Sequence, residues 1–346
     1  MFKKFLSLFS KDIGLDLGTS NIRVYLRGRG VVISESAVVA VNTRNDQIIA
    51  IGNSALKMMG KVPGHILVVQ PLNHGVILDF EVTEKMLKSI FEKVHRDTFT
   101  LVPRPRVVAV VPLDVTEVEQ KSLEDVILQV GAREVFLVER PMAAAIGAKL
   151  PIQESTGNMI VELGGGLSEV AVISLNGIVS WKSLKIGGES FNKNIINYVR
   201  EKFGVLLGSQ TAEEVKIKIG SAIPVDNPQE MKVKGRDLIS GLPKEVVITD
   251  TQIREAIDPL LKVIFEAVHD TVESTPPELV ADIYERGLVL SGGGAMIPGF
   301  DKLIQKKVNI PVYVTDDPAT SVIRGTGLIL EDFENLRQVF VPSSRD

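Results

Sequence analysis

A short pattern occurs twice in this chain and constrains its fold more than any other feature. In the first copy an apolar strand over residues 13–15 ends in Asp16, Leu-Gly follows, and a polar turn leads into a strand that alternates apolar and polar residues. In the second copy an apolar strand over residues 159–161 ends in Glu162, Leu-Gly-Gly-Gly follows, and another apolar strand begins. The spacing between the copies is far longer than the roughly 20–50 residues of a solenoid repeat. The pattern therefore predicts a duplicated α/β domain with a ligand cleft between the copies.

The turn after each acidic residue is typical of a phosphate-binding hairpin. The Walker A loop and the dinucleotide fingerprint both need a helix to begin at the glycines, whereas a strand follows each turn here. Glycine lets backbone amides approach an anion closely, and the hydroxyl groups of Thr19, Ser20 and Ser168 add donors. Asp16 and Glu162 cannot bind phosphate, and we expect them to hold Mg²⁺ through water. One such hairpin is more often a plain turn, but the pair favours a clamp on a polyphosphate.

A third glycine cluster follows the apolar strand at residues 288–290. Bare backbone at this Ser-Gly-Gly-Gly can admit a flat adenine ring, and a helix is expected over residues 300–308. Further helices are expected over residues 54–59, 82–94 and 117–130, with Thr83 as the N-cap of the second. Asn176-Gly177 is expected to close a tight hairpin.

Composition narrows the classes of function. The net charge is −4, whereas a protein that binds nucleic acid through its overall field is basic, so we expect no nucleic-acid partner. The chain has no cysteine, which excludes disulfides and thiolate metal sites. Its four histidines are far apart and lack the spacing of metal ligands. No apolar run reaches the roughly 20 residues that span a bilayer. Any membrane contact is therefore expected to be peripheral.

Residues 1–10 combine two lysines with an apolar stretch that is too short for a signal peptide. As a helix, this segment places Phe2, Phe5, Leu6 and Phe9 on one face, which predicts a small interfacial helix. One such helix binds lipid weakly, but many copies along a polymer bind strongly. The alternative is that the helix packs onto the body of the protein.

Several segments together resemble the superfamily of actin, sugar kinases and heat-shock ATPases, and their detail is similar to MreB, the bacterial actin family. The resemblance runs from the N-terminal segment to about Leu330. The segments that carry it are residues 16–21 (DLGTSN), 141–147 (PMAAAIG), 164–166 (GGG), 169–177 (EVAVISLNG), 186–188 (IGG), 195–200 (IINYVR) and 276–279 (PPEL).

The resemblance implies an actin-like fold, a ribonuclease H-like unit duplicated into two domains around a nucleotide cleft. The implied organisation is a membrane helix at 1–10, domain I at 11–140 with a small subdomain at about 32–73, domain II at 141–316 with a small subdomain at about 182–242, and a return to domain I at 317–346.

ATP and Mg²⁺ are the ligands that the resemblance implies, and each glycine cluster receives a role. The implied metal residues are Asp16 and Glu162. The implied nucleotide-binding residues are Asp16, Gly18, Thr19, Ser20, Asn21, Gly164, Gly165, Gly166, Glu213, Lys216, Gly292, Gly293, Gly294, Ala295 and Met296. Phe99 and Leu101 lie in a loop where the family carries residues that dip into lipid, although burial in the core is an equal alternative.

Three positions on the catalytic side depart from the family pattern. Arg140 stands where the family usually has a water-ordering Glu, and Leu167 stands where it has Thr. Glu162 replaces an Asp, and Glu139 lies one residue before Arg140, about 100° away on a helix. A guanidinium has no acceptor for water, so we expect ATP binding with slow or absent hydrolysis. The alternatives are a fully active ATPase that drives filament turnover, and a chaperone ATPase or sugar kinase of the same superfamily.

The resemblance also implies where the chain works and what it meets. It implies a cytoplasmic protein, peripheral on the inner face of the cell membrane, that forms filaments with itself. Other MreB paralogues, membrane lipid and cell-shape membrane proteins are the further partners that it implies.

Overall fold

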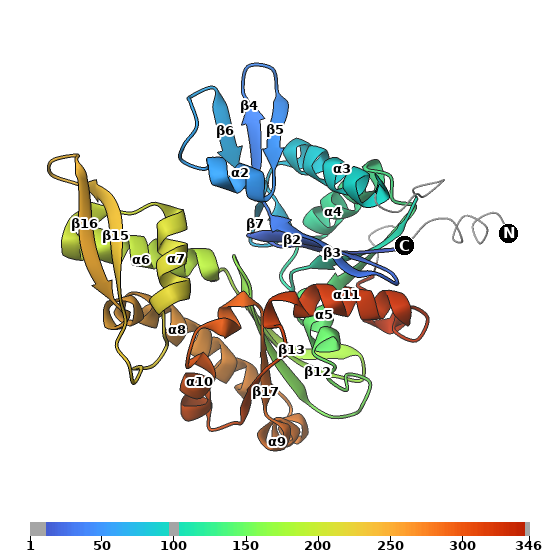
Figure 1. Cartoon of the computed structure of the whole chain (residues 1–346). Coiled ribbons are helices and arrows are strands. Elements are labelled where there is room, and N and C mark those ends of the chain that lie inside the picture. The colour runs from blue at the N-terminus through green and yellow to red at the C-terminus, as the bar shows by residue number, and fades with distance from the viewer. Residues whose placement is uncertain (1–11, 97–103, 343–346) are drawn as a thin grey trace. The chain divides into compact units, whose positions relative to one another are not determined.

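The computed structural model describes residues 12–96 and 104–342, which form two compact units (Figure 1). The first comprises the described residues up to Thr156, residues 173–179 and those after Pro318. The second comprises residues 157–172 and 180–318. No helix in the described ranges is long and apolar enough to cross a membrane.

The main sheet of the first unit has the strand order β10-β9-β1-β2-β3. The strands are β1 (Ile13–Leu17), β2 (Asn21–Leu26), β3 (Gly30–Ser36), β9 (Arg106–Val111) and β10 (Glu134–Glu139). β1 to β3 are antiparallel, whereas β9 is parallel to β1 and β10. All five residues of β1 are buried, because this central strand is covered on both faces. Its carboxyl end therefore delivers Asp16 into a site shielded from water.

Helices cover both faces of this sheet. α3 (Phe80–Arg96) and α4 (Glu117–Gln129) pack against one another, and their apolar faces complete the core of the first unit. α5 (Arg140–Gly147) and α11 (Ser321–Glu331) lie together, with α11 against β1 and β2 (Figure 1). A Cβ on Gly147 would lie 1.9 Å from the Ser321 carbonyl oxygen, and one on Gly325 would lie 1.8 Å from that of Ala143. The two backbones are therefore in direct contact.

The start of α3 differs from the sequence prediction. Asp79, not Thr83, caps this helix, because Asp79 Oδ1 accepts a hydrogen bond from the amide of Val82 at 3.0 Å. Thr83 lies one turn inside and is fully buried, and its hydroxyl donates to the Asp79 carbonyl at 2.6 Å. The prediction was wrong because Thr bonds equally well to the carbonyl one turn back. α4 does have a threonine cap, Thr116, in a capping box with Glu119.

Two smaller sheets complete the first unit. β4 (Val39–Asn42), β5 (Gln47–Ile51) and β6 (Ile66–Val69) have the order β5-β4-β6 and carry α2 (Asn53–Met58). β7 (Leu72–Asn73) and β8 (Val76–Ile77) form a short hairpin. After α11, the 3-10 turn η3 (Arg337–Val339) brings Phe340 back to pair with Val138.

The main sheet of the second unit has the order β13-β12-β11-β17-β18. The strands are β11 (Asn158–Leu163), β12 (Ser168–Ser174), β13 (Gly177–Leu184), β17 (Leu288–Ser291) and β18 (Val312–Val314). The turn between β12 and β13 is centred on Leu175 and Asn176, whose φ values are 50° and 61°. Asn176-Gly177 was therefore predicted one residue too late, because Asn176 takes the second left-handed position of the turn.

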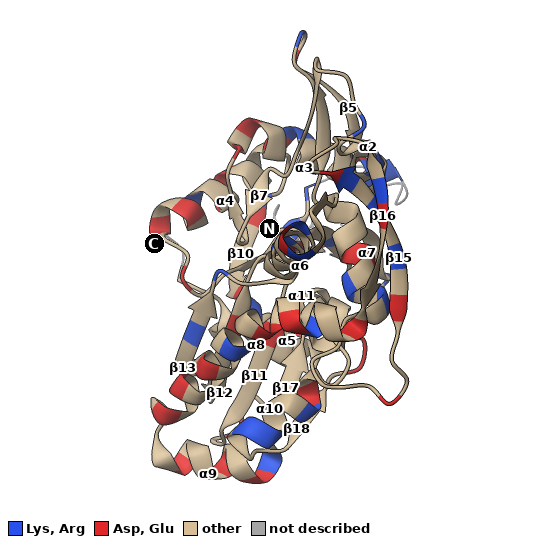
Figure 2. Cartoon of the chain, turned by 90° about the vertical axis from the view of Figure 1, so that its left-hand side faces the viewer, with Lys and Arg blue, Asp and Glu red and all other residues tan. Residues whose placement is uncertain are grey.

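Helices and a further small sheet surround the second main sheet. They are α6 (Gly188–Phe203), α7 (Ser209–Ile219), α8 (Asp250–Glu273), α9 (Pro277–Arg286), α10 (Phe300–Val308) and the strands β14 (Val205–Leu206), β15 (Glu230–Asp237) and β16 (Pro243–Thr249). Two 3-10 turns, η1 (Gly293–Met296) and η2 (Pro318–Thr320), follow β17 and β18. α10 has the predicted bounds. α7, α8 and α10 each carry both acidic and basic residues (Figure 2).

Candidate functional site

The first Gly-rich turn joins β1 to β2. The Gly18 amide donates to the Asn21 carbonyl at 3.0 Å, which closes the turn around Thr19 and Ser20. A Cβ on Gly18 would lie 2.9 Å from that carbonyl oxygen, so the turn accepts only glycine there without a shift. Glycine is thus required by the tight closure, as the motif predicts.

Thr19 connects this turn to the β7–β8 hairpin. Its side chain is only 5% exposed, and its Oγ1 accepts a hydrogen bond from the amide of Gly75 at 3.2 Å. Gly75 and His74 both have positive φ, which makes a tight turn possible there. Sequence reasoning missed this hairpin as a neighbour of the first turn, although Asn73 and Gly75 are turn-forming residues between the apolar Leu72 and Val76.

Asp16, at the end of β1, lies between two arginines. Arg140 Nη2 is 3.0 Å from Asp16 Oδ1, and Arg23 Nη1 is 3.5 Å from Asp16 Oδ2. Arg23 faces Asp16 because the two residues are direct partners in the β1–β2 register. Arg140 reaches it from the first position of α5. The side chains of Asp16, Arg140 and Arg23 are 3%, 7% and 16% exposed, so this cluster is almost dry.

The surroundings of Asp16 do not fit a magnesium ion. Mg²⁺ demands near-ideal octahedral geometry and usually keeps several waters beside one or two carboxylates. Here each carboxylate oxygen already faces a guanidinium, and the residue is 2% exposed. The two arginines also give the cluster a positive net charge, which repels a cation.

The second Gly-rich turn joins β11 to β12. The Gly164 amide donates to the Leu167 carbonyl at 2.8 Å, which repeats the closure of the first turn. Glu162 is 3% exposed at the end of β11, and Leu167 is also 3% exposed. The Ser168 hydroxyl donates to the Ile186 carbonyl at 2.7 Å, so its proton is directed at the protein rather than at a ligand.

The first residues of α6 form hydrogen bonds to the backbone of the second turn. The amides of Gly188 and Glu189 donate to the carbonyls of Gly164 and Gly165 at 3.0 and 2.8 Å. A Cβ on Gly187 would lie 2.6 Å from the carbonyl carbon of Gly165, so the two segments touch through bare backbone. The carbonyls of the turn are thereby fixed.

Glu213 and Lys216, predicted near the ribose and adenine, belong to a hydrogen-bonded cluster on α6 and α7. Lys216 Nζ donates to Glu213 Oε2 at 2.8 Å and to the Gly188 carbonyl at 3.0 Å. Asn192 Nδ2 donates to the same Glu213 oxygen at 2.6 Å. Asn192 was missed, because nothing local in the sequence indicates which residue of α6 faces α7. The cluster connects α7 to the second turn through Gly188.

The third glycine cluster packs on the end of β11. A Cβ on Gly292 would lie 2.4 Å from the Leu163 carbonyl oxygen, and one on Gly294 would lie 2.8 Å from the Leu163 Cβ. A Cβ on Gly293 would meet nothing within 4 Å, and Met296 is 64% exposed. Two of the three glycines therefore serve close packing, and both the second turn and this cluster meet Leu163.

Glu139 ends β10 and precedes Arg140. Its side chain is partly buried, and this burial raises the pKa of the carboxyl.

The predicted lipid-binding residues Phe2, Phe5, Leu6, Phe9, Phe99 and Leu101 lie outside the described residues.

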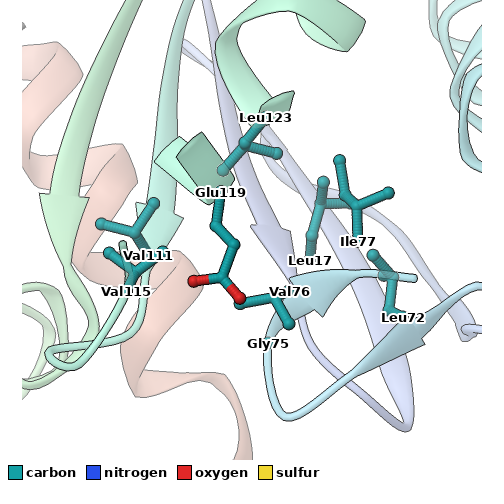
Figure 3. Close-up of a pocket in the computed structure, with 9 residues that line it drawn as sticks. All are labelled: Leu17, Leu72, Gly75, Val76, Ile77, Val111, Val115, Glu119 and Leu123. Carbon is teal, nitrogen blue, oxygen red and sulfur yellow. The ribbon is translucent and has the colours of Figure 1, made fainter. Parts of the chain in front are cut away.

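A small, mainly apolar pocket lies beside the first turn. Leu17 lines it together with residues of the β7–β8 hairpin and α4, and Glu119 is the one charged residue among them (Figure 3). Oε2 of Glu119 accepts hydrogen bonds from the amide and hydroxyl of Thr116 at 2.9 and 2.7 Å. The carboxylate is thus part of the α4 cap, and the pocket offers little polar chemistry.

Two α/β units, each with an acidic strand end and a Gly-rich turn before a strand, define an actin-like fold. A solved structure of MreB5 of Spiroplasma citri bound to AMPPNP aligns with a TM-score of 0.90 and 36% identity, over 94% of this chain and 97% of that one. A structure of the same protein bound to ADP aligns with a TM-score of 0.89. The MamK double helical filament aligns with a TM-score of 0.78 at 19% identity, which supports the fold alone.

The chain belongs to the MreB/Mbl family, whose model matches residues 10–338. It is 47% identical over 337 residues to the cell shape-determining protein MreB of Escherichia coli strain K12, which covers 96% of each chain. It is 39% identical over 329 residues to the cell shape-determining protein Mbl of Bacillus subtilis strain 168, over 95% of this chain and 98% of the relative. The family resemblance and the fold class predicted from sequence are confirmed.

Proposed function

We propose that this chain is an actin-like cytoskeletal protein that binds ATP, polymerises into membrane-associated filaments and takes part in cell-shape control, with weak or absent ATP hydrolysis. Its similarity to cell shape-determining proteins over almost its whole length supports the cytoskeletal role. Self-association into filaments is part of this proposal, and the MamK double helical filament is an example of this fold in a filament.

Nucleotide binding is proposed for the two Gly-rich turns and the third glycine cluster. MreB5, which is 36% identical, binds AMPPNP and ADP. In this chain both turns are closed by the same amide-to-carbonyl bond, from Gly18 to Asn21 and from Gly164 to Leu167. A tight Gly-rich turn closed in this way can present backbone amides to an anion such as a phosphate. Because Asp16 does not fit Mg²⁺, Glu162 stays the predicted metal residue.

The ion pair between Arg140 and Asp16 is the observation that supports the proposal of weak ATP hydrolysis. Hydrolysis of the terminal phosphoanhydride bond of ATP depends on an acceptor that orients the attacking water, and a guanidinium has no acceptor. Losing that orientation costs on the order of 100-fold in rate. The second turn also lacks a hydroxyl donor for phosphate. Leu167 is apolar, and the hydroxyl of Ser168 donates its proton to the Ile186 carbonyl.

A fully active ATPase is the second candidate, and Glu139 is the observation that favours it. Burial raises the pKa of this carboxyl, and a raised pKa improves a general base. Phosphate release by a Glu139→Gln variant separates the two candidates, because only the active enzyme would lose rate through this change.

Phosphate release at saturating ATP tests the main proposal. The variant that combines Glu162→Asp, Arg140→Glu and Leu167→Thr is expected to release phosphate on the order of 100-fold faster than the unmodified chain. Equal rates would refute weak hydrolysis. Sedimentation of both proteins with AMPPNP and liposomes serves as the control, because filaments on lipid need folded, nucleotide-bound subunits but no hydrolysis.

A further inference from the structure

We propose that this chain binds the polyphosphate of its nucleotide without a divalent metal ion at Asp16, because Arg140 and Arg23 supply the positive charge there. The inference rests on the proposed nucleotide binding and specifies its ionic requirement. Arg140 and Arg23 each contact one of the two carboxylate oxygens of Asp16.

The charge of the cluster suits an anion and not a cation. One carboxylate and two guanidiniums sum to a positive charge, and all three side chains are largely removed from solvent. Charges in such surroundings interact far more strongly than in water. A polyphosphate without bound metal carries its full negative charge, so it gains most from this cluster. Each carboxylate oxygen of Asp16 already has a guanidinium beside it, which a metal ion would have to displace.

The position of Arg140 is fixed by packing. It begins α5, and a cation at the start of a helix is unfavourable because of the helix dipole. The carboxylate of Asp16, 3.0 Å from the guanidinium, compensates for this unfavourable charge. α5 itself cannot shift easily, because its backbone touches α11 at Gly147 and Gly325. The guanidinium is therefore held beside the carboxylate, which is two residues before the first turn.

Arg23 alone would not replace a metal ion. Its nearest nitrogen is 3.5 Å from Asp16, and it is more exposed than Arg140. Arg140 therefore has the main role in replacing the metal ion. Removing its charge should leave Asp16 undercompensated and make a divalent ion favourable beside the bound phosphates.

The decisive experiment is calorimetric titration of the full chain with AMPPNP, once with Mg²⁺ and once with EDTA. The dissociation constants of the unmodified protein are expected to agree within about threefold. The Arg140→Gln variant is expected to bind about 10-fold or more weakly in EDTA than in Mg²⁺, because each unit of uncompensated charge in a dry site is costly.

Arg133→Gln is the matched control. Arg133 makes a comparable buried ion pair, with Nη2 3.2 Å from Asp12 Oδ1, before the other end of β1. This variant should keep the metal-independent binding of the unmodified chain. Circular dichroism of each variant shows whether it folds. If a variant does not fold, the titrations of the unmodified chain still decide whether nucleotide binding needs a divalent metal ion.

The possible outcomes differ for the two proposals. Binding by the unmodified chain that weakens 10-fold or more in EDTA overturns metal independence and leaves nucleotide binding intact. Equal metal dependence of the unmodified chain and the Arg140→Gln variant overturns the role of Arg140. Absence of AMPPNP binding in both buffers overturns the proposed function and this inference with it.

Discussion

The guanidinium of Arg140 lies 3.0 Å from the carboxylate of Asp16, and both side chains are almost wholly removed from solvent. Asp16 is the last residue but one of the central strand of the first unit, and Arg140 begins a helix more than a hundred residues later in the chain. This pair decides the charge beside the first Gly-rich turn, so it governs both the stability of the unit and the ions that the turn accepts.

Replacing Arg140 by methionine should destabilise the protein, because it leaves Asp16 buried with only the more distant Arg23. Breaking a buried pair by removing one partner costs about 3–5 kcal/mol, and we expect the lower end of this range. Urea unfolding measures the change. The double variant with Asp16→Asn should recover most of the loss, and a double variant no more stable than Arg140→Met would contradict the pairing.

Replacing Gly325 by alanine should destabilise the first unit by about 1–3 kcal/mol, because overpacking forces the backbones of α5 and α11 apart. The new Cβ would lie 1.8 Å from the Ala143 carbonyl oxygen. Thermal unfolding followed by circular dichroism tests this. Gly64→Ala is the control, since a Cβ there meets nothing within 4 Å. Similar melting temperatures for both variants would show that the helices do not touch.

Replacing Glu139 by glutamine should stabilise the protein at neutral pH and not in acid. Burial raises the pKa of Glu139, so the neutral form is favoured by folding. Its contribution to stability is fully present below the unfolded pKa of about 4.3 and is lost as the pH rises through the folded pKa. Glutamine stays neutral throughout. Urea unfolding of the unmodified chain and the variant, at neutral pH and in acid below the unfolded pKa, checks this. A difference in free energy of unfolding that is the same at both pH values would argue against a buried carboxyl.

Tyr198 should titrate later than an ordinary tyrosine. Partial burial, with a 2.6 Å hydrogen bond from its hydroxyl to Glu255, raises the pKa of Tyr198 to about 12. Its contribution to stability is therefore present below about pH 10 and lost as the pH rises toward 12. Ultraviolet titration of tyrosinate follows this step. Tyr198→Phe should remove the late phase, and Glu255→Gln should move it to lower pH; a late phase unchanged in Tyr198→Phe would assign it elsewhere.

Local patterns predicted much of the fold, because local physics decides those elements. The acidic residues near the strand ends, both Gly-rich turns and the bounds of α10 follow from strand alternation, glycine and helix periodicity in short windows, although each strand continues one residue beyond its acidic residue. Asp79 and Thr83 show the limit, because both residue types can cap a helix, whereas the structure places Asp79 at the start of α3 and Thr83 one turn inside. Nothing within the window distinguished them.

The contacts of the candidate site were less accessible from sequence, since they join distant segments. Arg140 was recognised as an unusual residue, but its partner Asp16 depends on how β10, β9 and β1 align in the sheet. Asn192 faces Glu213 only because α6 packs on α7. Two of the three glycines in the third cluster serve packing against Leu163 rather than an open surface. Pairings of this kind need a register that no single segment encodes.

Hydrogen bonds join the second turn to α6, and Lys216 and Glu213 extend this connection to α7. This connection makes a fluorescent reporter of the second turn possible. Because the chain lacks cysteine, one thiol introduced on α7 would be unique for labelling. Ile217 is 69% exposed on that helix, next to Lys216. A fluorophore at this position would not contact the second turn, but α7 is joined to that turn through the hydrogen bonds of Gly188. Its emission would therefore report ligand binding at the second turn in real time.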